Sequence, residues 1–196
     1  MPPSPAPILL IISGPAGSGK TTLCERLLEE FPQRIQRVVT TTSRPPRPGE
    51  SDGVDYHFLS PETFEERIRE GAFIEWARVH GRYYGSRGED IRRQVQSGHD
   101  LLLNIDIQGA RSFRDNSALR EWIPRGVQSV FIKPRSMDQL RDRLARRGED
   151  PDEIDRRLQS AAIEIREAGA FDHVIVSGSK EADYAALRDL YTSLKK

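Results

Sequence analysis

The sequence predicts an α/β fold: a P-loop parallel sheet covered by helices on both faces, with a small α/β insertion and a helical lid. Three observations support this prediction. Short apolar runs alternate with amphipathic runs of helical length, which is the order that builds a parallel sheet. The first apolar run leads into a glycine-rich loop and then a helix, as in phosphate-binding α/β units. A segment rich in proline and glycine interrupts the alternation between residues 43 and 86.

The length of 196 residues predicts a single domain. Lys plus Arg and Asp plus Glu both number 30, so no overall field favours nucleic acid or a membrane surface, and we expect neither as a partner. No apolar run approaches the ~18 residues of a membrane span. One cysteine, Cys24, excludes an intramolecular disulfide. We expect a cytoplasmic protein that is a monomer or a homodimer.

The elements follow from apolar periodicity and capping residues. Ser136 with Gln139, and Asp150 with Glu153, each fit the capping box at a helix start. Pro151 then occupies the first helical turn, where proline is favoured. The expected strands are 7–13, 36–41, 100–105, 128–132 and 173–177. The expected helices are 20–30, 87–97, 107–115, 136–147, 151–168 and 180–194. We assign 7–42, 87–135 and 169–196 to the core, 43–86 to the insertion and 136–168 to the lid.

The glycine-rich loop fits G-x-x-x-x-G-K-[ST], the phosphate-binding P-loop, and its flanking strand and helix give the context that the pattern needs. Glycines let several backbone N–H groups converge on one anion at the helix N-terminus. Lys20 can reach the outer phosphates of a nucleoside triphosphate, and the Thr21 hydroxyl can ligate Mg²⁺. A glycine-rich turn without a ligand is the alternative, and the complete motif disfavours it. The expected nucleotide-binding residues are Gly14, Pro15, Ala16, Gly17, Ser18, Gly19, Lys20 and Thr21.

The insertion opens with Arg44 and Arg47 among three prolines. Proline fixes φ, so less entropy is lost when the two guanidinium groups bind a ligand. Two such groups can clamp one phosphate; a solvated basic turn is the alternative. Beyond this loop we expect strands over Asp55–Leu59, Phe73–Val79 and Arg82–Gly85. A helix over Pro61–Glu70, capped by Ser60, lies between them.

At this point the chain resembles the guanylate kinases from Ile8 nearly to its C-terminus. The motifs that carry the resemblance, in chain order, are the P-loop, Ser43-Arg44-Pro45-Pro46-Arg47-Pro48-Gly49, Gly53-x-Asp55-Tyr56-x-Phe58, Phe73-Ile74-Glu75-Trp76-Ala77, Tyr83-Tyr84-Gly85-Ser86 and Ile105-Asp106-Ile107-Gln108-Gly109. The resemblance implies transfer of the γ-phosphoryl group of ATP to GMP, giving ADP and GDP, with Mg²⁺. It also implies a core, a nucleotide-binding region and a lid.

The resemblance further assigns roles to individual residues. The GMP phosphate would be held by Arg44, Arg47, Tyr56 and Tyr84. The guanine would be read by Thr40, Glu75 and Ser86, with Asp106 near the base and the metal. The chemistry of Glu75 agrees, because a carboxylate accepts from both guanine N1–H and the N2 amino group, whereas adenine presents an acceptor at N1. Tyr83 and Tyr84 could equally be core aromatics.

The apolar run Leu101–Leu103 ends in polar residues, a pattern by which P-loop enzymes bring a carboxylate toward Mg²⁺. Many members of the family have an acid at the position of Asn104, so metal ligation would fall to Asp106 and Thr21. Ser177-Gly178-Ser179 replaces an Asn-Asp stretch common at the family's adenine-binding edge.

Arginines are dense between residues 141 and 157. The resemblance assigns Arg143, Arg147 and Arg157 to a lid that closes over the nucleotide, with Arg143 binding the co-substrate and Arg147 and Arg157 acting with Lys20 and Arg44 in catalysis. The gap before Arg157 is one residue shorter than in relatives, which leaves its register open. We read Arg141, Arg146 and Arg156 as solvated helix charges with i, i+4 partners.

Two alternatives remain at this stage. A related P-loop kinase acting on a sugar phosphate would not need the arginine loop together with Glu75 and Ser86. A protein-interaction module of guanylate-kinase type would more often have a degraded P-loop, and the P-loop here is complete.

Overall fold

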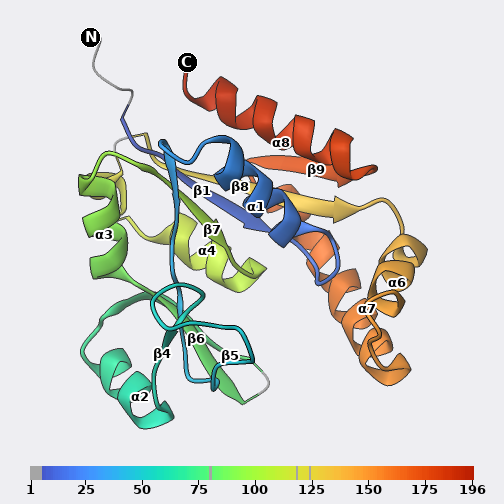
Figure 1. The fold of residues 1–196 in the computed structure, drawn as a ribbon, viewed down its shortest axis with the longest axis horizontal. Coiled ribbons are helices and arrows are strands. Elements are labelled where there is room, and N and C mark those ends of the chain that lie inside the picture. The colour runs from blue at the N-terminus through green and yellow to red at the C-terminus, as the bar shows by residue number, and fades with distance from the viewer. Residues whose placement is uncertain (1–5, 80, 118, 124) are drawn as a thin grey trace.

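The main sheet has five parallel strands in the order β2-β7-β1-β8-β9 (Figure 1). The computed structural model describes residues 6–79, 81–117, 119–123 and 125–196. The strands are β1 (Leu9–Ser13), β2 (Ile35–Arg37), β7 (Asp100–Asn104), β8 (Val127–Pro134) and β9 (His173–Ser177). This arrangement confirms the predicted parallel sheet.

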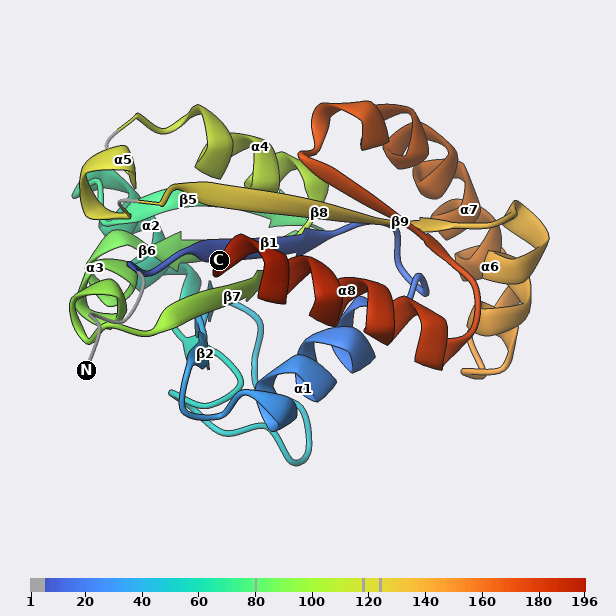
Figure 2. The ribbon, with the colours of Figure 1, turned by 90° about the horizontal axis from the view of Figure 1, so that it is seen from above.

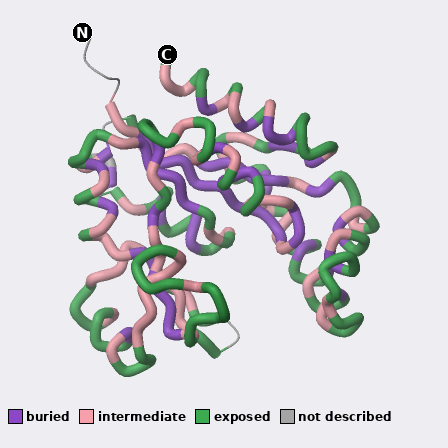
Figure 3. Tube along the Cα trace, in the orientation of Figure 1, coloured by how far each residue is buried: buried purple, intermediate pink, exposed green. Residues whose placement is uncertain are grey.

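Helices cover both faces of this sheet (Figure 2). Ile8, Leu10 and Ile12 pack against α1 (Lys20–Glu30) and α8 (Lys180–Leu194). Leu9 and Ile11 point the other way, toward α3 (Gly88–Gln96), α4 (Ile107–Asp115) and α5 (Leu119–Trp122). Since both faces of β1 are buried, its sequence is a continuous apolar run rather than an alternating one. The buried segments of Figure 3 gather along these strands.

A second, mixed sheet of order β4-β3-β6-β5 lies below the main sheet at the lower left of Figure 1. Its strands are β3 (Thr41–Thr42), β4 (His57–Phe58), β5 (Phe73–Val79) and β6 (Arg82–Arg87), and α2 (Pro61–Arg69) accompanies them. A helical hairpin at the lower right consists of α6 (Met137–Ala145) and α7 (Pro151–Arg166). Its two helices share their own apolar cluster of Leu140, Leu144, Ile154, Leu158 and Ala161.

Most predicted elements are confirmed, but the strand predicted over 36–41 is wrong as a single unit. The chain forms β2 beside β7 and then crosses to the second sheet as β3. β-Branched residues occur on both sides of the crossing, so composition gave no sign of it. Residues 167–170 form the 3₁₀ helix η1 (Glu167–Ala170), which follows α7, and the short α5 was not predicted.

The predicted helix caps form. Ser60 accepts from the Thr63 N–H and Ser136 accepts from the Gln139 N–H. Asp150 accepts from the Asp152 N–H, one residue earlier than a capping box predicts.

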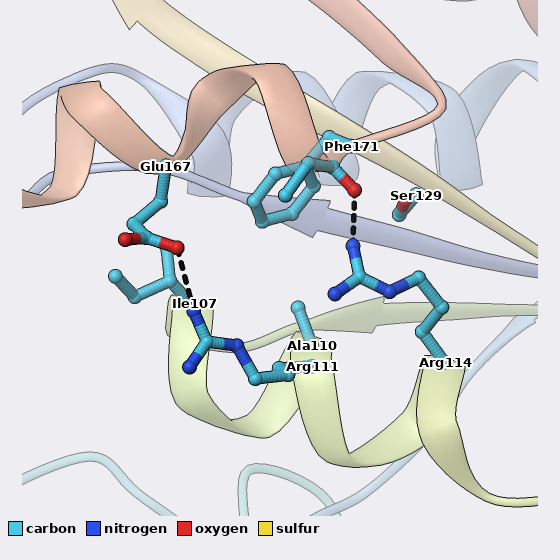
Figure 4. Close-up of a pocket in the computed structure, with 8 residues that line it drawn as sticks. Ile107, Ala110, Arg111, Arg114, Ser129, Glu167 and Phe171 are labelled. Carbon is cyan, nitrogen blue, oxygen red and sulfur yellow. Dashed lines mark hydrogen bonds and ion pairs between the residues drawn. The ribbon is translucent and has the colours of Figure 1, made fainter.

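The end of the hairpin is fastened to α4 (Figure 4). Arg111 forms an ion pair with Glu167 of η1 at 2.5 Å, and Arg114 donates to the Ala170 carbonyl. The cavity between these residues is only about 10 Å³, barely enough for one water, so it is not a ligand site. These contacts connect η1, which directly follows α7, to the helix whose N-terminus is capped by Asp106.

One buried polar cluster joins the two ends of the described chain. Asp100 is 4 % exposed and accepts from the Ile8 N–H (3.0 Å), the Tyr191 hydroxyl (2.6 Å) and Lys195 Nζ (2.8 Å). Among the described residues, no helix is long and apolar enough to cross a membrane.

We predict that Asp100→Ala is strongly destabilising, because two buried donors and the partly buried Lys195 ammonium lose their common acceptor. The expected loss is about 3–5 kcal/mol, measured by urea unfolding monitored by circular dichroism. Asp189→Ala is the matched control, since Asp189 is 69 % exposed on α8 and should change stability by less than ~0.5 kcal/mol. Equal losses in the two variants would contradict this assignment.

Candidate active site

Parallel topology brings four chain segments to the carboxyl edge of the main sheet. They follow the ends of β1, β7, β8 and β9, at Ser13, Asn104, Pro134 and Ser177. Ligands bind at this edge in open α/β sheets. The P-loop after β1 therefore lies beside three other loops that can complete its site.

The P-loop adopts the backbone that its glycines permit. Gly14, Gly17 and Gly19 have φ of 134°, 82° and 101°, a region that other residues avoid. A Cβ on Gly14 would lie 2.5 Å from the Ile132 carbonyl oxygen, so β8 leaves no room for one. The buried Ser18 hydroxyl has no partner among the described residues. An unpaired buried polar atom inside this loop fits a site that binds a polar ligand.

Lys20 folds back across the loop. Its Nζ donates to the carbonyls of Gly14 (2.6 Å) and Pro15 (3.0 Å). Burial lowers the pKa of the ammonium to about 8, although nearby Glu164 acts in the opposite direction. The amine therefore lies poorly solvated at the centre of the loop, where an anion would be a better partner than two carbonyls.

A cavity of about 390 Å³, the P-loop pocket, lies between the P-loop, the hairpin and the start of α8. Its lining consists of Gly17, Ser18, Gly19, Thr22, Leu23, Arg143, Arg146, Arg147, Gly178, Lys180 and Asp183. Arg143 of α6 donates to the Ser18 carbonyl at 3.2 Å, so the hairpin contacts the P-loop directly. The pocket thus combines backbone N–H groups, a helix N-terminus and three arginines around one space.

A second cavity of about 230 Å³, the Glu75 pocket, lies between the second sheet and the end of β7. Its lining consists of Thr40, Tyr56, Glu75, Ala77, Tyr84, Gly85, Asn104, Ile105 and Asp106. Five residues of the sequence-predicted acceptor site are in this lining, although they are far apart in the sequence. Gly85 allows the close approach of β5, since a Cβ there would lie 2.9 Å from the Glu75 carbonyl oxygen.

A local irregularity in β5 sets the orientation of the Glu75 side chain. The register shifts between Phe73 and Glu75, and this places Glu75 opposite Ser86 of β6. The Ser86 hydroxyl donates to Glu75 Oε1 at 2.7 Å. Burial raises the pKa of Glu75 to about 7, although the Ser86 hydrogen bond opposes the shift. A carboxylate this poorly solvated gains strongly from any ligand that donates two hydrogen bonds.

Arg44 lies at the edge of the Glu75 pocket. Its guanidinium is 5.4 Å from the centre of the Tyr56 ring, and the Tyr56 and Tyr84 rings meet edge to face at 6.3 Å. Glu50 engages Arg44 through two bonds of 2.8 and 2.9 Å and accepts the Arg47 N–H at 2.7 Å. The hydrogen bond to Glu50, with a smaller one to Tyr84, raises the pKa of Arg44. The structure thus brings three of the four predicted phosphate-binding residues together.

Asn104 and Asp106 line the Glu75 pocket, and Thr21 stands next to Thr22, which lines the P-loop pocket. Asn104 Nδ2 and Thr21 Oγ1 are 3.5 Å apart. One oxygen of Asp106 accepts the Gly109 N–H and so caps α4. Within the described residues, no cluster of three or more His, Cys, Asp or Glu could hold a metal ion by itself.

Other sequence-predicted residues lie outside the two pocket linings. Arg47 is on the exposed loop before Glu50. Arg157 forms ion pairs of 2.9 Å with Glu149 and Glu153 within the hairpin. Tyr83 stacks on Phe64 at 5.2 Å and its hydroxyl donates to Glu65, so it packs in the second sheet.

Arg141 and Arg156 are exposed and ion-paired, but these ion-pair partners do not have the predicted i, i+4 spacing. Arg141 pairs with Asp155 across the hairpin, and Arg156 pairs with Glu153 three positions earlier. Arg146 differs, because it lines the P-loop pocket.

Sequence reasoning missed three acidic residues at the site. Glu50 holds Arg44, and Glu164 of α7 acts electrostatically on both Lys20 and Asp106. Asp183 of α8 lines the P-loop pocket. Only Glu50 carried a usable signal, since it follows the arginine loop directly.

Fold and site together define a P-loop protein of the α/β class, with a second pocket beside its nucleotide-binding loop. The family model for guanylate kinase matches residues 7–194, and the chain belongs to the guanylate kinase family. A guanylate kinase of Symbiobacterium thermophilum is 44% identical over 196 residues, covering 100% of this chain and 89% of its own. One of Nitratidesulfovibrio vulgaris is 46% identical over 185 residues, covering 94% and 86%. The solved guanylate kinase of Anaplasma phagocytophilum superposes with a TM-score of 0.73 at 33% identity, over 98% of this chain and 87% of that one.

Proposed function

We propose that this enzyme transfers the γ-phosphoryl group of ATP to GMP, giving ADP and GDP, with ATP in the P-loop pocket and GMP in the Glu75 pocket. The observation that carries the proposal is the pair of pockets: one is built on a P-loop and the other on a buried carboxylate. Family membership supports the same reaction. The role of the enzyme would be GMP recycling in purine nucleotide metabolism.

The donor side works by electrostatics and position. Backbone N–H groups of the P-loop, in which Pro15 has none, and the Lys20 ammonium hold the phosphates of ATP. Arg143 of α6 binds the phosphates of ATP, and Arg147, in the turn that follows α6, neutralises charge on the transferring group. We assign residues 136–168 to a lid, whose closure also carries Arg157 toward the nucleotide. Closure excludes water, which strengthens every charged contact inside the site.

The acceptor side fixes the nucleophile and reads the base. Arg44 and Arg47 clamp the GMP phosphate, with the Tyr56 and Tyr84 hydroxyls beside them. Glu75 accepts from guanine N1–H and the N2 amino group, while Ser86 and Thr40 complete the base contacts. The phosphate is already an oxyanion near neutral pH, so the reaction needs no general base. Positioning supplies most of the rate.

The residues present fit Mg²⁺ bound together with ATP. Asn104 Nδ2 lies 3.5 Å from the Thr21 hydroxyl, and Asn104 and Asp106 both line the Glu75 pocket, so hydroxyl, amide and carboxylate groups are available beside the P-loop. Kinase sites commonly bind Mg²⁺ through one or two side chains plus substrate phosphates. We propose Thr21 and Asp106 as its protein ligands. When bound, the ion offsets the charge that develops on the phosphate oxygens.

The substrate assignment is tested by measuring ADP production from ATP and Mg²⁺ with GMP, dGMP, AMP, UMP and ribose bisphosphate as acceptors. We expect turnover with GMP to exceed that with AMP and UMP by at least ~10³-fold in kcat/KM. Turnover with the sugar phosphate in place of GMP would contradict the proposal. Tight GMP binding without any turnover would identify a binding module instead.

Arg44→Met tests the phosphate clamp. Methionine keeps the unbranched apolar stem and loses the guanidinium, so kcat should fall and the KM for GMP should rise together. The expected combined loss in kcat/KM is about 10²-fold or more. The control is Arg67→Met, because Arg67 is exposed and pairs only with Glu70 among the contacts that the structure gives it. Unchanged kinetics in the Arg44 variant would rule out this role.

The raised pKa of Glu75 predicts that guanine binding depends on pH. Only the carboxylate accepts both donors, so binding releases a proton below a pH of about 7. Affinity should therefore rise with pH up to about 7 and level off above it, with a limiting slope of ~10-fold per pH unit on the acid side. Guanosine is the ligand to titrate between roughly pH 5.5 and 8, because GMP carries its own phosphate pKa near 6. The same slope in Glu75→Gln would contradict this explanation.

A further inference from the structure

A buried chain of hydrogen bonds connects the start of α8 to the P-loop. Asp183 is 6 % exposed and Ser177, at the end of β9, is fully buried. Asp183 Oδ2 accepts from the Ser177 hydroxyl at 2.6 Å, and its Oδ1 accepts from the Gly178 N–H at 2.6 Å. Both oxygens of this buried carboxylate are thus engaged, and both partners belong to one loop.

The chain of hydrogen bonds continues to Arg143, which lies on α6 of the hairpin. Arg143 Nη1 donates to the Ser177 hydroxyl oxygen at 3.0 Å and to the Ser18 carbonyl at 3.2 Å. Arg143 Nη2 donates to the Gly178 carbonyl at 3.4 Å. Three acceptors from the P-loop and the β9–α8 loop therefore fix the guanidinium of Arg143.

We call the hydrogen bonds that run from Arg143 through Ser177 to Asp183 the relay. Asp183 decides which group donates in each of them. A serine hydroxyl carries one hydrogen and accepts through its lone pairs, while a carboxylate can only accept. The Ser177 hydrogen must therefore point to Asp183, which leaves the oxygen lone pairs for Arg143. If Asp183 could donate instead, the hydroxyl hydrogen would turn toward the guanidinium, which has no acceptor for it.

Apolar packing supports the same contact. A Cβ on Gly17 would lie 3.0 Å from Leu144 and 3.1 Å from Leu140, so α6 rests on the P-loop on either side of Arg143. Arg143 and Asp183 both line the P-loop pocket. The orientation of Arg143 is thus determined at the wall of the pocket to which we assign ATP.

We propose that Asp183 is a positioning residue for the co-substrate: through Ser177 it holds Arg143 against the P-loop in the orientation that binds the ATP phosphates. The inference rests on the proposed function, since it takes the P-loop pocket as the ATP site. Asp183 itself need not touch the nucleotide. Its effect reaches the phosphates only through Arg143.

The test is calorimetric binding of ADP and, separately, of GMP to the full chain. Asp183→Asn keeps the shape but places an amide donor opposite the Ser177 hydroxyl. We expect ADP to bind about 10-fold more weakly, while the Kd for GMP stays within ~2-fold. Ser177→Ala removes the relay at its middle and should weaken ADP binding similarly, which covers the case in which Asp183→Asn does not fold. The matched control is Asp189→Asn, at an exposed aspartate of the same helix, and it should change neither Kd.

A double-mutant cycle separates positioning from a general effect on folding. In an Arg143→Met background, Asp183→Asn should weaken ADP binding by no more than about 2-fold, because the residue through which it acts is gone. An undiminished 10-fold effect in that background would overturn the proposal, as would folded Asp183→Asn and Ser177→Ala proteins that bind ADP like the wild type. A wild-type chain that binds GMP but not ADP would instead refute the ATP-site assignment, and this inference with it.

Discussion

Lys20→Met should reduce kcat by about 10²–10³-fold, the size of effect seen when one charged or preorganised donor to a developing charge is removed. Methionine preserves the length and apolar stem of the side chain but removes the ammonium that lies among the P-loop carbonyls. GMP affinity should be unaffected, because the Glu75 pocket does not include Lys20. The measurement is steady-state ADP production with both substrates saturating.

Stability provides the control for Lys20→Met. Burial disfavours the charged form of Lys20, so the variant should be as stable as the wild type or more stable. A large loss of stability would mean that the fall in kcat reflects damage to the fold. A variant that is folded and retains full kcat would contradict the donor assignment.

Glu75→Gln should reverse much of the preference for guanine. The amide can accept only one of the two guanine donors, and its NH₂ group opposes the other, whereas adenine N1 can accept from that NH₂. We expect kcat/KM for GMP to fall by about 10²-fold. We expect the ratio of kcat/KM for GMP to kcat/KM for AMP to fall by more than that, because kcat/KM for AMP rises. The measurement is kcat/KM for both acceptors at one ATP concentration.

Glu75→Gln keeps the shape of the side chain. In the wild type the Ser86 hydroxyl donates to the Glu75 carboxylate, and it can still donate to the amide oxygen of glutamine. The wall of the pocket is therefore preserved. The control is Glu70→Gln, at a half-exposed glutamate of the same region whose contact is an ion pair with Arg67. Retention of the wild-type GMP-to-AMP ratio by the Glu75 variant would refute the model of base recognition.

Elements with strong local signals could be predicted from the sequence. The helices over 20–30, 107–115 and 180–194 have the predicted bounds, because glycine, aspartate or serine at each start and the apolar spacing act locally. The single strand over 36–41 could not be resolved, since the crossing between the two sheets depends on which strands pair, not on propensity. The four-residue α5 is too short for a periodic pattern.

Some residues of the candidate site could likewise be predicted from the sequence, and others could not. The P-loop and the residues of the Glu75 pocket were visible as motifs, and the structure gathers five of them around one cavity. Glu164 was not visible, because its neighbour Lys20 is 144 positions away and only the packing of α7 brings it close. Asp183 was hidden for another reason: it reads as an ordinary first-turn acid of a helix, and its burial is a tertiary property.

The central claim is that donor and acceptor occupy separate pockets with separate determinants. The most direct test is calorimetric titration of ADP and of GMP into the wild type, Lys20→Met and Glu75→Gln. We predict that the wild type binds both ligands at once, that Lys20→Met weakens only ADP, and that Glu75→Gln weakens only GMP, each by at least ~10-fold. Competition between ADP and GMP for one site, or equal weakening of both ligands in either variant, would contradict the account.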